Sequence, residues 1–160
     1  MTDQNPAPDN AEAPVFRLQK MYIKDLSFEN PNAPEIFLGQ QPEPKVEVNL
    51  AVKNKKLEND HWEVSLSITA TVSNDKQEGQ TLFIVELEHA AVFLLKNIPE
   101  QRIQMVLGVD CPTMLLPFTR QIISQVSIDG GFIPFLLEPM NFLGMYENAK
   151  KQKAEKGKDN

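Results

Sequence analysis

The N-terminal half of the chain alternates apolar and polar residues with a period of two. Between Trp62 and Val72 every even position is apolar and every odd position is polar, which is typical of a strand with one buried face. The same alternation recurs over Val46–Val52 and Phe83–Phe93, and a less regular segment rich in β-forming residues covers Val15–Phe28. Polar connections rich in turn-forming residues separate the four segments. We therefore expect four consecutive strands paired as an antiparallel meander.

The C-terminal third changes to a helical period. Apolar residues recur three and four positions apart over 103–126, which predicts a helix packed on the sheet. We expect a break near Gly108–Cys111, with Pro112 in the first turn of the main helix. Pro117 should then kink this helix or start it instead. The glycines of Asp129–Gly131 should end it.

Three places carry more apolar residues than a solvated surface usually does. In Phe132–Leu137 five of six residues are large and apolar, although prolines exclude regular structure there. This loop is either buried under the helices or the lip of an exposed groove. The helix over 112–126 has a thin polar face, which indicates that a second subunit covers it. Leu82 and Ile84 fall on the expected solvent face of the fourth strand beside Glu86, as in a docking patch.

Length and composition fit one domain. The 160 residues are 41% hydrophobic and 24% charged, which suffices for a single core. We expect a disordered leader at 1–14 and one domain at 15–147, whose last element is a short helix at about 141–151. A lysine-rich, flexible tail should occupy 148–160.

The net charge of −6 is unevenly placed along the chain. Residues 148–160 hold five lysines against Glu155 and Asp159, so their net charge is +3 and residues 1–147 carry −9. A strongly acidic domain does not favour binding to the phosphates of nucleic acid. It favours basic or unfolded partners.

We expect a cytoplasmic protein that does not insert directly into a membrane. The longest apolar run, Ala90–Leu95, is far shorter than the roughly 20 residues of a membrane span. The polar segment Met1–Pro14 has none of the features of a signal peptide. The single cysteine, Cys111, cannot form an internal disulfide and fits a reducing cytosol.

The residues with reactive side chains form no recognisable catalytic or metal-binding pattern. The chain holds two histidines, His61 and His89, and one cysteine, all far apart in sequence. A zinc site or a Cys–His pair needs several such groups together. The sequence also lacks a glycine-rich phosphate-binding motif. We therefore expect no cofactor, no metal and no enzymatic activity.

Four ordered motifs make the chain resemble the SecB family of bacterial protein-export chaperones. These motifs are Tyr22–Pro34, Glu86–Phe93, Cys111–Arg120 and Gly130–Phe142. The likeness covers about 15–146, almost the whole expected domain. It implies an α+β fold in which a four-stranded antiparallel sheet packs with two C-terminal helices. It also implies a homotetramer built as a dimer of dimers.

The resemblance further implies that the protein binds unfolded precursor proteins without ATP, keeps them competent for export and delivers them to the motor protein SecA. By motif position, the implied SecA-binding residues are Asp25, Glu29, Ile84 and Glu86. The implied client groove consists of Phe132, Phe135, Leu136, Leu137, Met140 and Phe142. The expected tetramer interface consists of Leu115, Phe118, Ile122, Ile123 and Val126.

Some residues depart from the family pattern, and two other functions stay open. The tail after Asn148 is lysine-rich rather than acidic or neutral, which leaves its contact with SecA open. Ile84 occupies a position that is more often Leu, and the loop reads Phe-Ile-Pro-Phe instead of Phe-Pro-Pro-Leu. One alternative is a SecB-like chaperone dedicated to a toxin–antitoxin pair, which need not keep a SecA patch. Another is a small hydrolase or lipid-binding enzyme that uses the same apolar groove.

Overall fold

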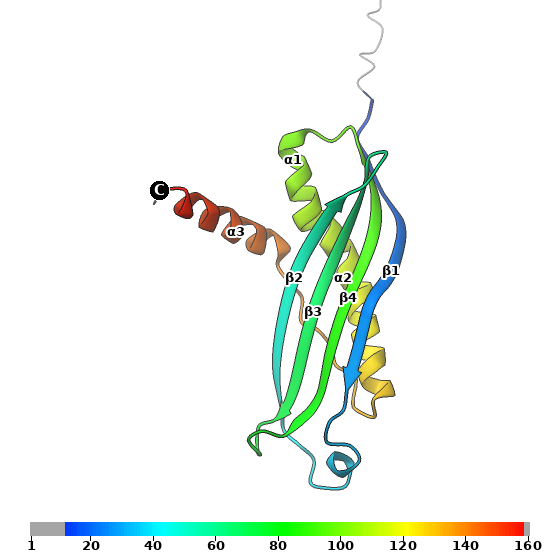
Figure 1. The fold of residues 1–160 in the computed structure, drawn as a ribbon, viewed down its shortest axis with the longest axis vertical. Helices are drawn as coiled ribbons and strands as arrows, with labels where there is room; N and C mark the ends of the chain where they lie inside the picture. Colours follow the sequence, from blue (N-terminus) through cyan, green and yellow to red (C-terminus); the bar gives the residue numbers. More distant parts are fainter. Residues whose placement is uncertain (1–11, 159–160) are drawn as a thin grey trace, which may run out of the picture.

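The computed structural model describes residues 12–158, so most of the expected leader lies outside the described part. Within residues 12–158, four strands precede the helices (Figure 1). The strands are β1 (Val15–Glu29), β2 (Pro44–Lys56), β3 (His61–Asn74) and β4 (Thr81–Lys96). The helices are α1 (Glu100–Met105), the π-helix η2 (Val106–Asp110), α2 (Cys111–Asp129) and α3 (Phe142–Lys156). A short 3₁₀ turn, η1 (Glu35–Phe37), lies between β1 and β2. The predicted α+β class and the four strands are confirmed.

The predicted meander is wrong for the first strand, because β1 pairs with β4. The sheet has the order β1-β4-β3-β2 and is antiparallel throughout. Residues 30–43 form a crossover, which is too long for a tight hairpin and instead spans the end of the sheet. There, Asn32 Nδ2 donates to the backbone oxygen of Thr81 at 2.8 Å. The crossover therefore carries β2 to the far edge and leaves β1 beside β4.

One face of the sheet, here called the inner face, packs against α2. Alternate residues of β3 and β4, such as Leu66 and Phe93, are fully buried on this face. From the helix, Leu115 and Ile123 contribute side chains that are equally inaccessible to solvent. In Figure 1, α2 runs behind the strands and α1 stands beside their upper ends. The opposite, outer face carries the polar residues of the same alternation, as the period of two predicted.

The main helix, α2, begins at Cys111 with Pro112 in its first turn, as predicted, but no break in helical backbone precedes it. Helical backbone runs without interruption from Glu100 to Asp129 through η2. In η2 the N–H of Cys111 bonds to the carbonyl of Val106, five residues back. This wider turn accommodates Pro112, which has no N–H to donate, without ending the helix. Pro117 lies inside α2 and does not start it.

The helix ends as predicted, at two glycines. Gly131 has a φ of +92°, a conformation that costs glycine little. The N–H of Phe132 bonds to the carbonyl of Ser127 (3.0 Å), and the N–H of Gly131 bonds to that of Ile128 (2.9 Å). Together these two bonds form a Schellman cap, which satisfies the last carbonyls of the helix and reverses the chain.

The last helix, α3, is capped by Asn141, whose Oδ1 accepts a hydrogen bond from the N–H of Gly144 (3.0 Å). It continues to Lys156, five residues beyond the expected end. Much of the lysine-rich segment 148–160 is therefore helical, while the flexibility predicted for it stays a prediction. Figure 1 shows α3 projecting sideways from the sheet and α2.

No helix in the part described, 12–158, is both long enough and apolar enough to cross a membrane.

Candidate functional site

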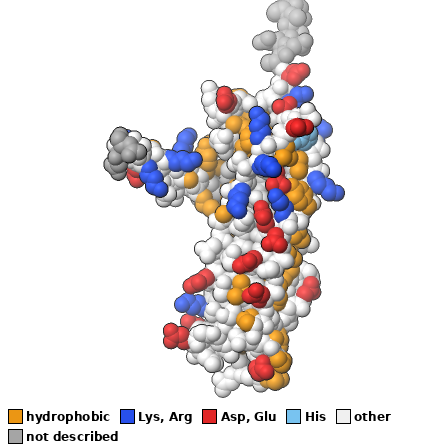
Figure 2. Space-filling view, viewed as in Figure 1, with side chains coloured by type: hydrophobic (Ala, Val, Ile, Leu, Met, Phe, Trp, Pro, Cys, Tyr) orange, Lys and Arg blue, Asp and Glu red, His pale blue; other side chains and the backbone are white. Residues whose placement is uncertain are grey.

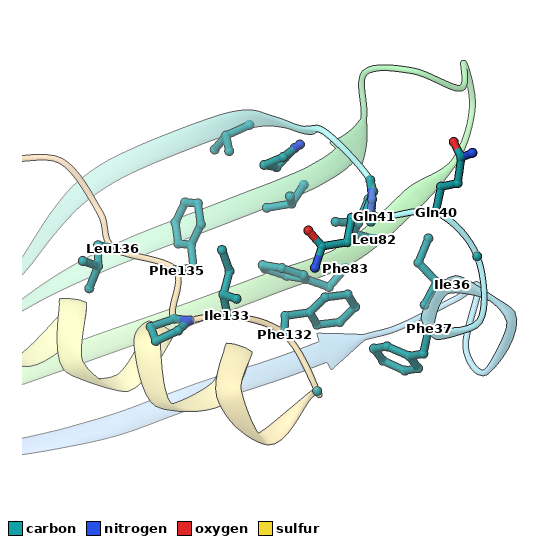
Figure 3. Close-up of a pocket in the computed structure, with 17 residues that line it drawn as sticks. Ile36, Phe37, Gln40, Gln41, Leu82, Phe83, Phe132, Ile133, Phe135 and Leu136 are labelled. Carbon is teal, nitrogen blue, oxygen red and sulfur yellow. The ribbon is translucent and has the colours of Figure 1, made fainter.

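An apolar cavity lies where the crossover 30–43 meets the loop after α2. Its volume is about 390 Å³, which is within the usual range of small ligand pockets. The crossover and the start of β2 form one wall, and residues 131–136 form the other wall. The end of β3 and the start of β4 form the floor. Two segments that are about a hundred residues apart in sequence thus enclose one site (Figure 3).

Phenylalanine rings dominate this cavity. Figure 3 shows the ring of Phe132 between those of Phe83 and Phe37, with centroid distances of 4.8 and 5.3 Å. Phe28 of β1 extends the cluster, 5.5 Å from Phe83. Each such aromatic pair adds about 0.5–1.5 kcal/mol beyond the burial of area. The cluster therefore holds the two wall segments together at the end of the sheet.

The loop after α2 is held in place by its backbone as well as by its rings. The N–H of Phe135 donates to Oγ of Ser127, a buried residue of α2, at 2.8 Å. Asn30 Nδ2 donates to the carbonyl of Gly130 at 3.2 Å. A Cβ at Gly131 would lie 2.9 Å from Cζ of Phe37 and would push this ring aside, and the φ of +92° strains any residue other than glycine. The loop is thus an ordered wall with a floor of buried apolar side chains.

The rim of the cavity is apolar and exposed. Ile133 is 81% exposed and Leu136 is 66% exposed, although both are large aliphatic residues. Phe37, on the opposite wall, is 47% exposed. Exposed apolar residues next to a preformed apolar cavity are typical of a surface that binds another molecule. The arrangement suits an apolar side chain in the cavity and further apolar contacts along the rim.

The structure brings only part of the predicted client groove to this cavity. Phe132, Phe135 and Leu136 line it. Leu137 is 2% exposed and Phe142 is 3% exposed, and both belong to the core. Met140 is half-buried against the core near Phe142. Prolines in the loop gave no indication of which side chains turn inward.

Sequence reasoning missed the wall that the crossover supplies. Ile36, Phe37 and the buried Phe83 line the cavity, yet none of them was predicted as a groove residue. The signal was present, because Ile36-Phe37-Leu38 is an apolar run inside a loop rich in Pro and Asn. The same kind of signal identified the loop 132–137.

The four predicted SecA-binding residues lie together on the outer face. Glu29 pairs with Ile84 across β1 and β4, Ser27 pairs with Glu86, and Asp25 pairs with Glu88. Asp25, Glu29 and Glu86 are exposed, and Ile84 is half-buried. The pairing of β1 with β4 creates this arrangement, so the patch depends on the crossover.

The acidic patch, defined as these four residues with Glu47 and Glu88, is larger than predicted. Glu47 of β2 pairs with Thr71, which in turn pairs with Ile84. Five carboxylates thus lie on the same face. Glu29 and Glu47 share a row with Ile84 and Glu86 lies two residues along β4, whereas Asp25 and Glu88 form a pair four residues along the strands. Leu82, expected on this solvent face, is instead 5% exposed and packs in the same core cluster as Ile36, because a register shift between β3 and β4 at Val72/Ser73 interrupts the alternation and Leu82 lines the cavity.

The predicted interface residues of α2 divide between two sides of the helix. Leu115 and Ile123 are fully buried against the chain's own sheet. Phe118 points away from it and is 48% exposed, and Ile122 and Val126 are half-buried. Two further apolar residues on α2, Met114 and Ile128, are also exposed. An apolar stripe therefore remains on the outside of α2.

Groups with reactive chemistry are buried or isolated. His89 Nδ1 lies 2.7 Å from Oγ1 of Thr119, between the sheet and α2, and burial lowers the pKa of His89. Burial and the nearby Asp110 raise the pKa of the Cys111 thiol to about 12, so this thiol is not a nucleophile near neutral pH. Among the described residues, no three His, Cys, Asp or Glu side chains are grouped to hold a metal ion.

Comparison with known proteins agrees with this geometry. The model of the family described as preprotein translocase subunit SecB matches residues 9–153. The chain is 62% identical over 145 residues to a protein-export protein SecB from Desulfotalea psychrophila, covering 91% of this chain and 92% of that protein. It is 45% identical over 151 residues to the same kind of protein from Magnetococcus marinus, covering 94% of each.

A solved structure shares the fold at low sequence identity. It is a SecB-like chaperone from Mycobacterium tuberculosis in complex with a peptide from an antitoxin. The TM-score is 0.64 at 14% identity, covering 79% of this chain and 91% of that chain. At this identity the likeness concerns the fold alone.

Proposed function

The chain belongs to the SecB family of preprotein translocase subunits, and from this premise we propose that it is a protein-export chaperone that holds unfolded precursor proteins without ATP. The observation that carries the proposal is the apolar cavity with its exposed aliphatic rim. An unfolded chain presents scattered apolar side chains, and a cavity of about 390 Å³ takes such side chains without reading a particular sequence.

Binding along the client extends beyond one cavity. Within residues 12–158 the edge strand β2 pairs with β3 alone, and an extended client segment adds to its other side through backbone hydrogen bonds. Several weak contacts along one client chain then combine into a higher overall affinity. The proposed activity is thus binding alone, with no covalent step, and its place is the cytoplasm, where precursors await export.

The acidic patch supports delivery to SecA. Its carboxylates steer a basic partner and set its register, while Ile84 supplies an apolar contact. A chaperone dedicated to one antitoxin needs no such patch. The patch therefore favours the export function over the toxin–antitoxin function.

The exposed stripe of α2 supports a homotetramer. A second cavity of about 570 Å³ lies beside it and is lined by Phe16 of β1 together with Val106 and Met114. Apolar surface that continues from a strand to a helix is usually covered by another subunit. We therefore propose that copies of the chain assemble through β1 and the outer side of α2.

The test of the client proposal uses the rim. The double variant Ile133→Ser and Leu136→Ser removes exposed apolar area without opening the core, so its far-UV spectrum should be unchanged. Its ability to suppress aggregation of an unfolded client should fall about ten-fold or more. The reason is that burying each of the two side chains against the client contributes about 1–2 kcal/mol of binding free energy. Leu38→Ser is the matched control, since Leu38 is 82% exposed and lies outside the cavity lining. Equal suppression by both variants would contradict the proposed site.

A further inference from the structure

The outer face of the sheet is divided by charge into two halves. The acidic patch occupies the half next to the crossover. In the other half, Lys20, Val92, Glu63 and Lys55 lie in one row across the four strands, and Tyr22, Ala90, Ser65 and Lys53 lie in the next. Figure 2 shows mostly blue side chains over the upper part of the sheet and mostly red ones lower down. We call the cationic half the basic half, defined by Arg17, Lys20, Lys24, Lys53 and Lys55.

Most of these cations are not neutralised. Within the described residues, the one ion pair joins Lys24 Nζ to Glu63 Oε1 at 3.0 Å. Tyr22 also donates to Glu63, and this hydrogen bond is the main cause that lowers the pKa of Glu63. Glu63 is therefore ionised, and its carboxylate already bonds to Lys24 and Tyr22. Glu58 and Asp60 lie in the adjoining turn, at the rim of the face, so four of the five cations on the face remain available.

The helix α3 carries further lysines. It carries Lys150, Lys151, Lys153 and Lys156, and Figure 2 shows its blue side chains on the side from which the outer face is seen. Beyond Tyr146 the helix has no large apolar residue. Contact through this surface would therefore be electrostatic, without insertion of side chains into an apolar phase.

The chemistry of the basic half favours a broad anionic surface over a small ligand or a single acidic peptide. Four of its five cations are lysines, which act as point charges, whereas arginine provides the paired geometry that binds one phosphate or carboxylate specifically. The charges spread across the width of a sheet, and neither described cavity lies among them. Clusters of four to eight Lys and Arg beside a membrane helix or on an amphipathic helix bind anionic lipid headgroups, and the basic half offers a similar number of cations on a sheet.

We propose that the basic half, together with α3, docks on the headgroups of an anionic lipid bilayer. The acidic half is repelled by the same surface, so the molecule stands with the basic half against the lipid and the acidic patch away from it. This inference goes beyond client holding and delivery and depends on neither. It gives the chaperone a weak, salt-sensitive membrane contact that leaves its acidic patch free.

Flotation of the full chain with lipid vesicles tests the proposal. At low ionic strength, about 0.05 M, the protein should bind vesicles that contain phosphatidylglycerol and should not bind pure phosphatidylcholine vesicles. Lys53→Gln with Lys55→Gln should weaken this binding about 25-fold, from about five-fold for each lysine. The matched control, Lys45→Gln with Lys76→Gln, changes the net charge equally. Because Lys45 lies at the acidic end of β2 and Lys76 in the β3–β4 turn, it should bind nearly as wild type.

If the two double variants bind the anionic vesicles equally more weakly than wild type, binding responds to net charge only and the proposal is overturned. Absence of wild-type binding to the anionic vesicles would overturn it as well. Binding of a polyglutamate peptide by a protein that ignores vesicles would assign the basic half to an acidic polypeptide instead. Client holding by the wild-type protein is a separate assay, measured without vesicles. A failure of the membrane proposal therefore leaves the proposed chaperone function untouched.

Discussion

At the scale of single residues, the chain places its one fully enclosed histidine between the two layers of the fold. His89 is 2% exposed, and its Nδ1 shares a hydrogen bond with the hydroxyl of Thr119, which also lies 3.1 Å from the carbonyl of Leu115. The neutral imidazole suits this site because it brings no charge into the core. The period of two in the sequence had placed His89 on the buried face of its strand, but the partner on α2 was not predictable without the packing.

The buried histidine makes stability depend on pH. Burial lowers the pKa of His89 in the folded protein, whereas the unfolded chain takes up this proton near the ordinary value of about 6.5. Stability is therefore full above about pH 6.5 and falls as the pH drops toward the lowered pKa, because only the unfolded state gains the proton. Urea unfolding at fixed protein concentration, at about pH 7.5 and about pH 5.5, measures the loss.

His89→Gln should reduce that loss, while His61→Gln should keep it, because His61, the first residue of β3, is partly exposed and its ring contacts the carbonyl of Glu58. The prediction fails if wild type and His89→Gln lose stability equally between the two pH values.

The prediction of buried side chains succeeded where the local period of two decides the face, and failed where that period is interrupted or a distant segment supplies the packing. The alternation in β3 and β4 correctly separated the inner from the outer side chains. Leu82 was expected on the outer face, but a register shift between β3 and β4 at Val72/Ser73 interrupts the alternation and Leu82 packs in the core. In the same way, Phe37 and Phe83 become cavity residues only because two loops meet.

At the scale of elements, the sequence predicted all four strands and the glycine end of α2, because each depends on neighbouring residues. It did not predict η2, where Gly108 approaches Tyr146 of α3 so closely that a Cβ would lie 3.1 Å from the ring. Nor did it predict the pairing of β1 with β4. The alternation within a strand is the same whether a hairpin or a crossover follows it, so the pattern does not tell which strand becomes its neighbour.

The two sides of α2 predict different effects of an added charge. Phe118→Asp changes a residue that is 48% exposed in the single chain, so the domain should fold. In the proposed tetramer the carboxylate would be buried without a partner, which should weaken assembly by about 3–5 kcal/mol. Light scattering at low micromolar concentration should then show a smaller species than the roughly 72 kDa expected for four chains of 18.1 kDa.

Ile123→Asp provides the contrast, because Ile123 is fully buried within the same chain. This variant should lose folded structure itself, as seen by circular dichroism, and not merely its assembly. A Phe118→Asp protein that remains tetrameric would place the interface elsewhere.

At the scale of the whole molecule, the apolar cavity and the acidic patch lie at the same end of the sheet on opposite faces. Adjacent residues of β4 connect them, because Phe83 forms part of the cavity floor and Ile84 lies in the acidic patch. The alternation of a strand places these two side chains on opposite faces. A partner on the patch is therefore separated from a bound client by one layer of sheet.

The charge of the patch leads to a prediction about SecA. Glu29→Gln with Glu86→Gln removes two exposed charges that flank Ile84, and should weaken SecA binding about ten-fold at low salt. Folding and client holding should be unchanged, because neither carboxylate forms an ion pair within the described residues. The wild-type affinity should fall as salt rises, and the affinity of the double variant should fall less steeply, since fewer charges are left to screen.

The control for this experiment changes the same amount of charge outside the patch. Glu58→Gln with Glu100→Gln alters two exposed carboxylates, one in the β2–β3 turn and one at the start of α1. If delivery depends on net negative charge alone, both double variants will lose affinity equally, and the assigned patch is wrong. If delivery depends on the arrangement around Ile84, only the Glu29→Gln, Glu86→Gln variant will lose affinity. The reason is that the pairing of β1 with β4 brings Glu29 and Glu86 next to this one apolar contact.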